Sequence, residues 1–145
     1  MKKHIHFCAL LFITTTLTSC SSAIFETNNK SNNAQACNVG KVRLTANFAA
    51  GRMNDCKITA LNVYLVTLIP ENTPINSSPW YAFKVEADQP TQITIVMKVK
   101  GDKHRYPPKV SADGKIWNLQ EHQLDNGTLT MQIDVNEKPT YIAAQ

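Results

Sequence analysis

The chain has 145 residues, of which 43% are hydrophobic and 18% are charged, and its formal net charge is +4. This length allows one domain, and the hydrophobic content suffices for a globular core and excludes a chain that is disordered throughout. No apolar run outside the N-terminus approaches the ~20 residues of a membrane-spanning helix, and no basic stripe favours binding to nucleic acid.

The N-terminus has the pattern of a secretory signal. The basic segment MKKHIH precedes an apolar run of 11 residues, FCALLFITTTL, and the run ends in LTSC with Cys20 last. Leucine, two small residues and cysteine form the pattern of a bacterial lipobox, which predicts a signal peptide over 1–19 and lipid on the Cys20 thiol. A second acylation at the new N-terminus would add the anchoring that one acyl chain lacks. The alternatives are an ordinary secretory signal with a chance cysteine, or an N-terminal anchor helix.

A lipobox has consequences for the cellular location of the protein and for the net charge of the mature chain. The residues after Cys20 are Ser21 and Ser22. They lack the Asp that often retains lipoproteins in the inner membrane. We therefore expect a lipid-anchored protein of the bacterial cell envelope, in the outer membrane of a Gram-negative cell, with the bilayer as its partner. Removal of Lys2 and Lys3 leaves 13 basic and 11 acidic residues, so the net charge of the mature chain is +2.

The four cysteines have different expected fates. Cys8 leaves with the signal peptide and Cys20 carries the lipid, which leaves Cys37 and Cys56 in an oxidising compartment. A disulfide is expected there, and closing a loop of this length stabilises a fold by roughly 3 kcal/mol. A pair of free thiols is the alternative. Two cysteines alone do not make a zinc site.

Residues 20–38 are rich in Ser and Asn and predict a flexible tether, and the pattern becomes that of a β-sandwich domain over 39–139. Alternating apolar residues predict the first strand, and an apolar run on both faces predicts a central strand over 61–69. No helix longer than one turn is expected. The predicted strands are 41–48, 61–69, 80–87, 91–100, 115–119, 128–135 and, as a further candidate, 140–144.

Turn signals separate these strands. Asp113-Gly114 and Asn126-Gly127 are dipeptides that favour tight hairpins, because both supply positive φ angles at low cost. Short strands with a turn about every ten residues are typical of a sandwich or barrel. The prediction is an all-β, mostly antiparallel, jelly-roll-like sandwich of seven to nine strands.

The residue types that carry catalysis are sparse. His104 and His122 are the two histidines outside the signal region, and His122 with Asp125 has an H-x-x-D spacing that could supply half of a zinc site. The alternative interpretation is a polar hairpin tip before Asn126. The sequence contains no G-x-S-x-G motif and no glycine-rich phosphate loop. We therefore expect neither a catalytic residue nor a metal site in this chain.

Aromatic residues gather between positions 80 and 117. They favour either a core or an exposed platform for carbohydrate or peptide. His104, Arg105 and Tyr106 are expected to brace a loop, and Pro107-Pro108 is expected to force an extended run into KVS (109–111). The candidates for the platform are Trp80, Tyr81, Phe83, His104, Arg105, Tyr106 and Trp117.

Three segments carry a family resemblance: FAAGRMNDC (48–56), NVYLVTLIPENTPINSSPWYAFKV (62–85) and HRYPPKVSADGKIWNL (104–119). Together they resemble the N-terminal β-sandwich domain of bacterial zinc carboxypeptidases of the cytosolic-carboxypeptidase-like type. In that family a stretch similar to PINxSPWYAF is followed by one similar to HRYxPKxSxDGxxW. The resemblance covers 40–143, and PTYIAAQ resembles the join to the catalytic domain.

The resemblance implies an accessory domain without catalysis of its own. The family's zinc ligands, an H-x-x-E pair and a distant His, and its general base lie in the catalytic domain, and no H-x-x-E occurs here. We expect residues 140–145 to be a truncated junction to a missing catalytic domain, which would be the partner and would supply any zinc. The alternative is a free-standing surface module that binds carbohydrate or peptide through exposed aromatics.

Overall fold

The computed structural model describes residues 36–75, 77 and 79–144. These residues form only strands and connecting segments, so no described part makes a helix that could cross a membrane. The predicted signal peptide and Cys20 lie outside them. The strands are β1 (Ala36–Val39), β2 (Val42–Thr45), β3 (Asp55–Ala60), β4 (Val63–Leu68), β5 (Ala82–Ala87), β6 (Thr91–Val99), β7 (Pro108–Ser111), β8 (Asn118–Leu119), β9 (Gln123–Asp125), β10 (Thr128–Val135) and β11 (Thr140–Ala144).

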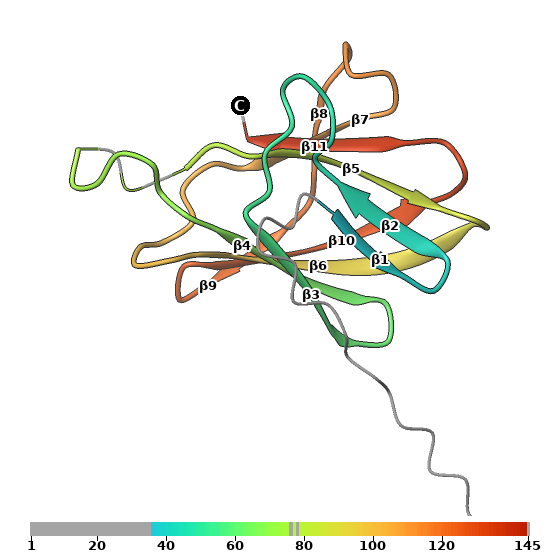
Figure 1. The fold of residues 1–145 in the computed structure, drawn as a ribbon, viewed down its shortest axis with the longest axis horizontal. Coiled ribbons are helices and arrows are strands. Elements are labelled where there is room, and N and C mark those ends of the chain that lie inside the picture. Colours follow the sequence, from blue (N-terminus) through green and yellow to red (C-terminus); the bar gives the residue numbers. More distant parts are fainter. Residues whose placement is uncertain (1–35, 76, 78, 145) are drawn as a thin grey trace, which may run out of the picture.

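The strands form two sheets that pack face to face (Figure 1). One sheet has the order β1-β2-β5-β11-β7-β8 and the other has the order β3-β4-β6-β10-β9. Strand pairs are antiparallel except for β4 with β6, which run parallel. The chain leaves β4 for β5 in the opposite sheet before it returns as β6, and this crossover gives β4 and β6 the same direction. The predicted all-β sandwich is confirmed.

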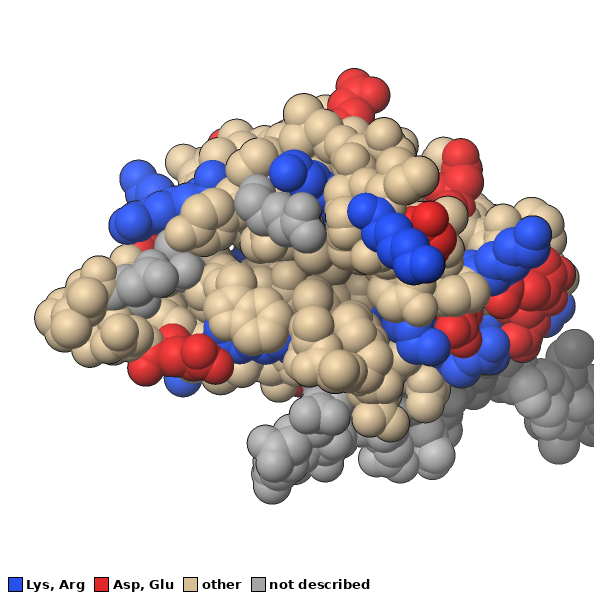
Figure 2. All heavy atoms as spheres, turned by 90° about the horizontal axis from the view of Figure 1, so that it is seen from above, with Lys and Arg blue, Asp and Glu red and all other residues tan. Residues whose placement is uncertain are grey.

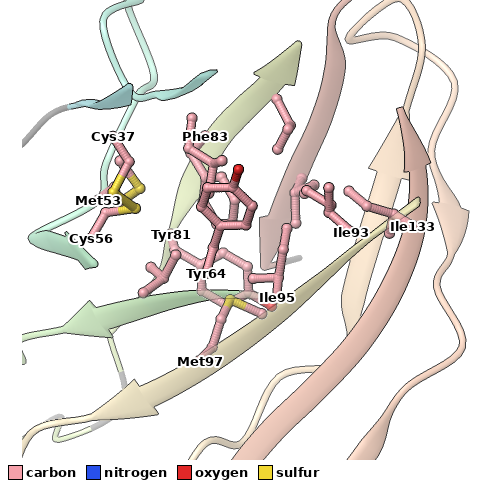
Figure 3. Packing of buried hydrophobic residues seen from close by; sticks show 14 of the residues in the cluster. Cys37, Met53, Cys56, Tyr64, Tyr81, Phe83, Ile93, Ile95, Met97 and Ile133 are labelled. Carbon is pink, nitrogen blue, oxygen red and sulfur yellow. A yellow bond between two sulfur atoms is a disulfide. The ribbon is translucent and has the colours of Figure 1, made fainter. Parts of the chain in front are cut away.

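Alternation along the strands places one face of each sheet in the core. Ile93, Ile95, Met97 and Val99 on β6 are buried, as are the members of β4 that alternate in the same way. The core side chains of the two sheets meet in one layer, with the pair Cys37 and Cys56 at its margin (Figure 3). The largest fully buried side chains are Tyr81, Phe83, Leu44, Leu68, Ile93, Ile95, Met97, Leu129, Met131, Ile142, Val66 and Val85.

The predicted disulfide is present. It joins Cys37 on β1 to Cys56 on β3, with the two Cα atoms 5.7 Å apart. Because β1 and β3 are edge strands of different sheets, the bond closes one side of the sandwich. The alternative of two free thiols is wrong for this fold.

The structure corrects several predicted boundaries. The predicted tether, 20–38, overlaps β1, and β3, β7 and β9 were not among the predicted strands. The described residues therefore form eleven strands and not seven to nine. Most of 115–119 is loop, because only the two residues of β8 pair with β7. β11 lies between β5 and β7. Residues 140–144 therefore belong to the sandwich, which extends past the predicted boundary at 139.

The two dipeptide turns behave differently. Asn126 and Gly127 both have positive φ, at 48° and 77°, and they join β9 to β10 in a tight hairpin as predicted. Asp113-Gly114 lies instead within a longer loop between β7 and β8, where the Asp113 carboxylate accepts hydrogen bonds from the backbone N–H groups of Lys115 (2.8 Å) and Ile116 (2.9 Å). That loop is held by a side chain and not by a two-residue turn.

Candidate interaction surface at the end of the sandwich

The last strand ends between two long loops. The backbone N–H of Ala144 donates to the carbonyl oxygen of Tyr81 (3.0 Å), and Ala144 pairs with Pro108 across β11 and β7. Tyr81 ends the loop 69–81, and Pro108 ends the loop 100–108. Figure 1 places the C-terminus at the same end of the molecule as these loops. We call this region the end surface; it consists of the described residues of the first loop (69–75, 77 and 79–81) and of residues 100–107, which lead into β7.

Arg52 fixes the first of these loops. Its guanidinium is buried, with Nη2 donating to the carbonyl oxygen of Ile69 (2.7 Å) and Nη1 donating to that of Trp80 (3.2 Å). It also forms an ion pair with Glu71 (3.3 Å) and lies 5.4 Å from the centroid of the Trp80 ring. One side chain therefore binds both ends of the loop, a use suited to the five fixed donors of arginine.

The backbone around Arg52 explains why the side chain reaches this place. Arg52 and Ala82 exchange two backbone hydrogen bonds, of 2.6 and 3.1 Å, which extend the β2–β5 edge. The chain can turn tightly before Arg52 because Gly51 has no Cβ: a Cβ there would lie 1.7 Å from the carbonyl oxygen of Ala46. The segment FAAGR thus sets the position of the guanidinium.

A polar cluster joins the two loops. The Ser77 hydroxyl donates to the Asp102 carboxylate, and Arg105 Nη2 donates to the same carboxylate (3.2 Å). The hydrogen bond from Ser77, assisted by the Lys103 backbone N–H and the Arg105 charge, lowers the pKa of Asp102 below its ordinary value. Asp102 therefore stays charged and keeps loop 100–108 attached to loop 69–81.

His104 lies behind this cluster in the interior. It is 4% exposed, its backbone N–H donates to the carbonyl oxygen of Gly127 (3.0 Å), and its ring centroid is 5.4 Å from that of Tyr81. His104 Nε2 and the Tyr81 hydroxyl are both buried without a hydrogen-bond partner among the described residues. Burial, with a smaller contribution from the charge of His122, lowers the pKa of His104 to about 4, and burial raises the pKa of Tyr81.

The predicted platform residues divide between core and surface. Tyr81 and Phe83 are buried, and Trp117 is half-buried outside the core, so a continuous aromatic row does not form. Trp80 and Tyr106 are 46% and 39% exposed. His104 and Arg105 do brace a loop, as predicted, although the first acts from the interior. The predicted strand 115–119 does not carry Trp117 into the core, because Trp117 lies in the loop before β8.

The side chains of Tyr141 and Ile142, near the end of β11, lie against other residues of the sandwich. Ile142 is fully buried, and Tyr141 packs edge-on against Phe48 with ring centroids 5.7 Å apart, so neither forms a bare apolar patch. The exposed large apolar side chains of the end surface are Ile69, Ile75, Trp80 and Tyr106. In the left part of Figure 2, where these loops lie, mostly uncharged surface lies between small groups of charged side chains.

His122 and Asp125 do not form a metal site with a third ligand. In the part of the chain that the structure describes, no group of three His, Cys, Asp or Glu side chains could hold a metal ion. His122 Nδ1 lies 2.9 Å from the carbonyl oxygen of Gln120, beside a hollow of about 400 Å³, and Asp125 ends β9. This arrangement fits the hairpin-tip interpretation of the pair.

Sequence reasoning did not single out Arg52, Ser77 or Asp102. The sequence did carry one signal for Arg52, since it is the single charged residue in the otherwise uncharged stretch FAAGRM (48–53). Ser77 and Asp102 are 25 residues apart and sit in polar loops, where such residues are ordinary. Their pairing depends on how the two loops meet at the end of the sandwich.

The fold defines a β-sandwich module, and comparison with known proteins identifies its family. The family model described as "Cytosolic carboxypeptidase N-terminal domain" matches residues 44–144. The chain therefore belongs to this family, as the sequence resemblance indicated. The chain has no match among curated protein sequences.

Solved structures with the same fold include three carboxypeptidases. A putative carboxypeptidase A from Shewanella denitrificans is 18% identical with a TM-score of 0.56, and a metallo-carboxypeptidase from Burkholderia cenocepacia is 15% identical with a TM-score of 0.57. A putative carboxypeptidase from Burkholderia mallei is 15% identical with a TM-score of 0.55. Each match covers 70% of this chain and 28% of the other chain, so this chain corresponds to a little over a quarter of each of those proteins.

Proposed function

We propose that this protein is an envelope lipoprotein whose sandwich is the accessory domain of a carboxypeptidase-like protein and packs against a peptidase catalytic domain through the end surface. One observation carries this proposal. The family match and β11 both end at Ala144, which bonds to Tyr81 and pairs with Pro108, and the segments that lead to these two residues carry the exposed Trp80 and Tyr106. In the related carboxypeptidases, the much longer chain leaves room for the catalytic domain.

The end surface has the properties of a docking site. Ile75 is 84% exposed, and Ile69 and Trp80 are exposed to about half that extent, at 41% and 46%. Apolar side chains that gather on a surface favour contact with a partner. Arg52 and the Ser77–Asp102 hydrogen bond hold the loops in place beforehand, which reduces the entropy that docking would lose.

The domain would assist the reaction without taking part in its chemistry. We propose that it supports the catalytic domain and shapes access of peptide to it, and that zinc and the general base belong to that domain. By itself the chain is expected to bind no zinc and to release no C-terminal residue from a peptide. Lipid on Cys20 would hold the assembly at the membrane.

Site-specific photo-cross-linking in the native cell tests the docking surface. A photoreactive phenylalanine analogue replaces Trp80 or Tyr106, and Leu124, which is 55% exposed on the edge strand β9, is the matched control position. We expect cross-links from positions 80 and 106 to a peptide of a zinc carboxypeptidase domain and none from 124. Equal cross-linking from position 124, or none from 80 and 106, would contradict the proposal.

The exposure of Trp80 and Tyr106 also favours the second candidate, a free-standing module that binds carbohydrate or peptide. The two candidates differ in what the same positions touch. Cross-links from 80 and 106 to glycan or to unrelated peptides, with no peptidase among the products, would select this alternative.

A further inference from the structure

We propose that residues 101–107 form an acid-sensitive loop, in which uptake of a proton by the buried His104 ring drives that ring out of the sandwich and rearranges the end surface around Tyr106. This inference does not depend on a peptidase partner. It rests on two buried polar atoms that have no hydrogen-bond partner among the residues that the structure describes, His104 Nε2 and the Tyr81 hydroxyl oxygen.

The interior position suits only the neutral ring. His104 is 4% exposed and Tyr81 is 1% exposed, and their ring centroids are 5.4 Å apart. A protonated imidazole carries a charge and two N–H donors, whereas His104 Nε2 has no acceptor among the described residues. Burying such a charge without a partner is strongly unfavourable, so the charged ring has to reach water.

The surrounding titratable groups do not offset that charge. Tyr81, on the segment before β5, is neutral because burial raises the pKa of its hydroxyl. His122, before β9, opposes a positive charge on His104. In the same loop, Asp102 is bound by Ser77 and Arg105, and the side chain of Lys103 packs against Gly127.

The loop can open without unfolding the sheets. Gly101 has a φ of 81°, which allows a hinge at one end, and Pro108 is fixed at the other end by its pairing with Ala144. Between them, among the described residues, a backbone hydrogen bond from His104 to Gly127 (3.0 Å) and the hydrogen bond from the Ser77 hydroxyl to the Asp102 carboxylate hold the loop. Opening would therefore free Tyr106 and Arg105 while β6 and β7 stay in place.

Amide hydrogen exchange measured by NMR tests the proposal. The sample is the protein that spans residues 20–145 and carries the substitution Cys20→Ser, so that it bears no lipid. Protection factors, corrected for intrinsic exchange, are compared at pH 7 and 4.5 for the His104 amide and for Met97 at the centre of β6. With a pKa of about 4 in the closed loop and 6.5 in the open one, linkage predicts that opening becomes more frequent by at least tenfold. We expect protection at His104 to fall by that factor and protection at Met97 to stay constant.

Two variants separate this mechanism from general acid destabilisation. His104→Phe keeps a ring but cannot take up a proton, so protection across 101–107 should no longer depend on pH. Tyr81→Phe removes the unpartnered hydroxyl and keeps the histidine, so the pH dependence should remain. An unchanged protection factor in the original chain, or the same fall in His104→Phe, would overturn the proposal. If His104→Phe does not fold, the pH titration of the His104 ring C–H chemical shifts in the original chain decides the question. A His104 pKa near 6.5 would overturn the proposal, and a pKa well below 6.5 would support it.

Discussion

The guanidinium of Arg52 lies 5.4 Å from the centroid of the Trp80 ring and donates to the backbone carbonyl oxygen of the same residue at 3.2 Å. Arg52 thus holds both the side chain and the backbone of Trp80. An exposed aromatic ring that is held in this way presents a fixed shape at the end surface. It also makes the end surface depend on a residue that is itself buried.

We predict that Arg52→Leu destabilises the fold by about 2–4 kcal/mol, because the carbonyl groups of Ile69 and Trp80 each lose a charged donor. Urea denaturation followed by tryptophan fluorescence measures this change. Arg43→Leu is the control, since Arg43 forms ion pairs with Asp88 and Glu86 at the surface and should change the free energy of unfolding little. Equal effects of the two substitutions would show that Arg52 has no special role.

We predict that Gly51→Ala is destabilising by about 3 kcal/mol or more, because the new Cβ would lie 1.7 Å from a backbone oxygen and the turn must move. Gly40→Ala is the matched control. A Cβ at Gly40 has nothing within 4 Å, but its φ of 61° disfavours other residues, so the expected cost is only about 1 kcal/mol. Denaturation of both variants gives the loss of free energy of unfolding, which is steric in origin at Gly51 and conformational at Gly40. A loss for Gly51→Ala no larger than the loss for Gly40→Ala would contradict the described turn.

The long strands could be predicted because their pattern is strong. In β6 four apolar residues are buried at alternate positions, with less buried residues between them, and β10 follows a clear Asn-Gly turn. Both strands were therefore found with bounds within a residue. β1, β8 and β9 have two to four residues each, and their pairing depends on partners elsewhere in the chain. Such short segments lack a period that a sequence could reveal.

The end surface was predictable only in part. The aromatic residues identified the loops, and the cysteine count identified the disulfide. The sequence does not show which of Trp80 and Tyr81 faces water, because either register of a strand is consistent with alternation in this segment. Burial of His104 depends on the hairpin turn at Gly127, which is 23 positions later and reaches it through a backbone hydrogen bond.

We predict that replacing Cys37 and Cys56 by Ala lowers the free energy of unfolding by about 3 kcal/mol, since the bond restricts the unfolded chain over a separation of 19 residues. Thermal denaturation with and without reducing agent gives the same comparison in the original chain. Reducing agent should leave the double variant unchanged, which controls for other effects of the reagent. An unaltered melting temperature of the original chain after complete reduction is the contrary result.

We predict a pH-dependent contribution from Asp113. The backbone N–H groups of Ile116 and Lys115 and the hydroxyl of Ser111 lower the pKa of its carboxyl group. A depressed carboxyl pKa adds stability above the ordinary value of 3.8, and this stability is lost as the pH falls through the lower folded-state value. Asp113→Ala should therefore be less stable than the original chain at pH 7, and the difference should shrink below pH 3.8. Asp125→Ala is the control, and a difference for Asp113→Ala that does not vary with pH excludes the carboxylate as its cause.

We predict that Cys20→Ala abolishes lipid attachment, because Cys20 supplies the thiol at the end of the lipobox-like segment LTSC. Growth with a labelled fatty acid, followed by purification of the protein, measures the attachment. Cys8→Ala is the matched control, since Cys8 lies in the apolar run and should not be needed. Labelling lost in Cys20→Ala and kept in Cys8→Ala supports a lipoprotein, and it would place the end surface beside a membrane at the end of a tether. Labelling retained in Cys20→Ala would show that the acyl group is not carried by the Cys20 thiol, and it would contradict the lipobox interpretation of LTSC.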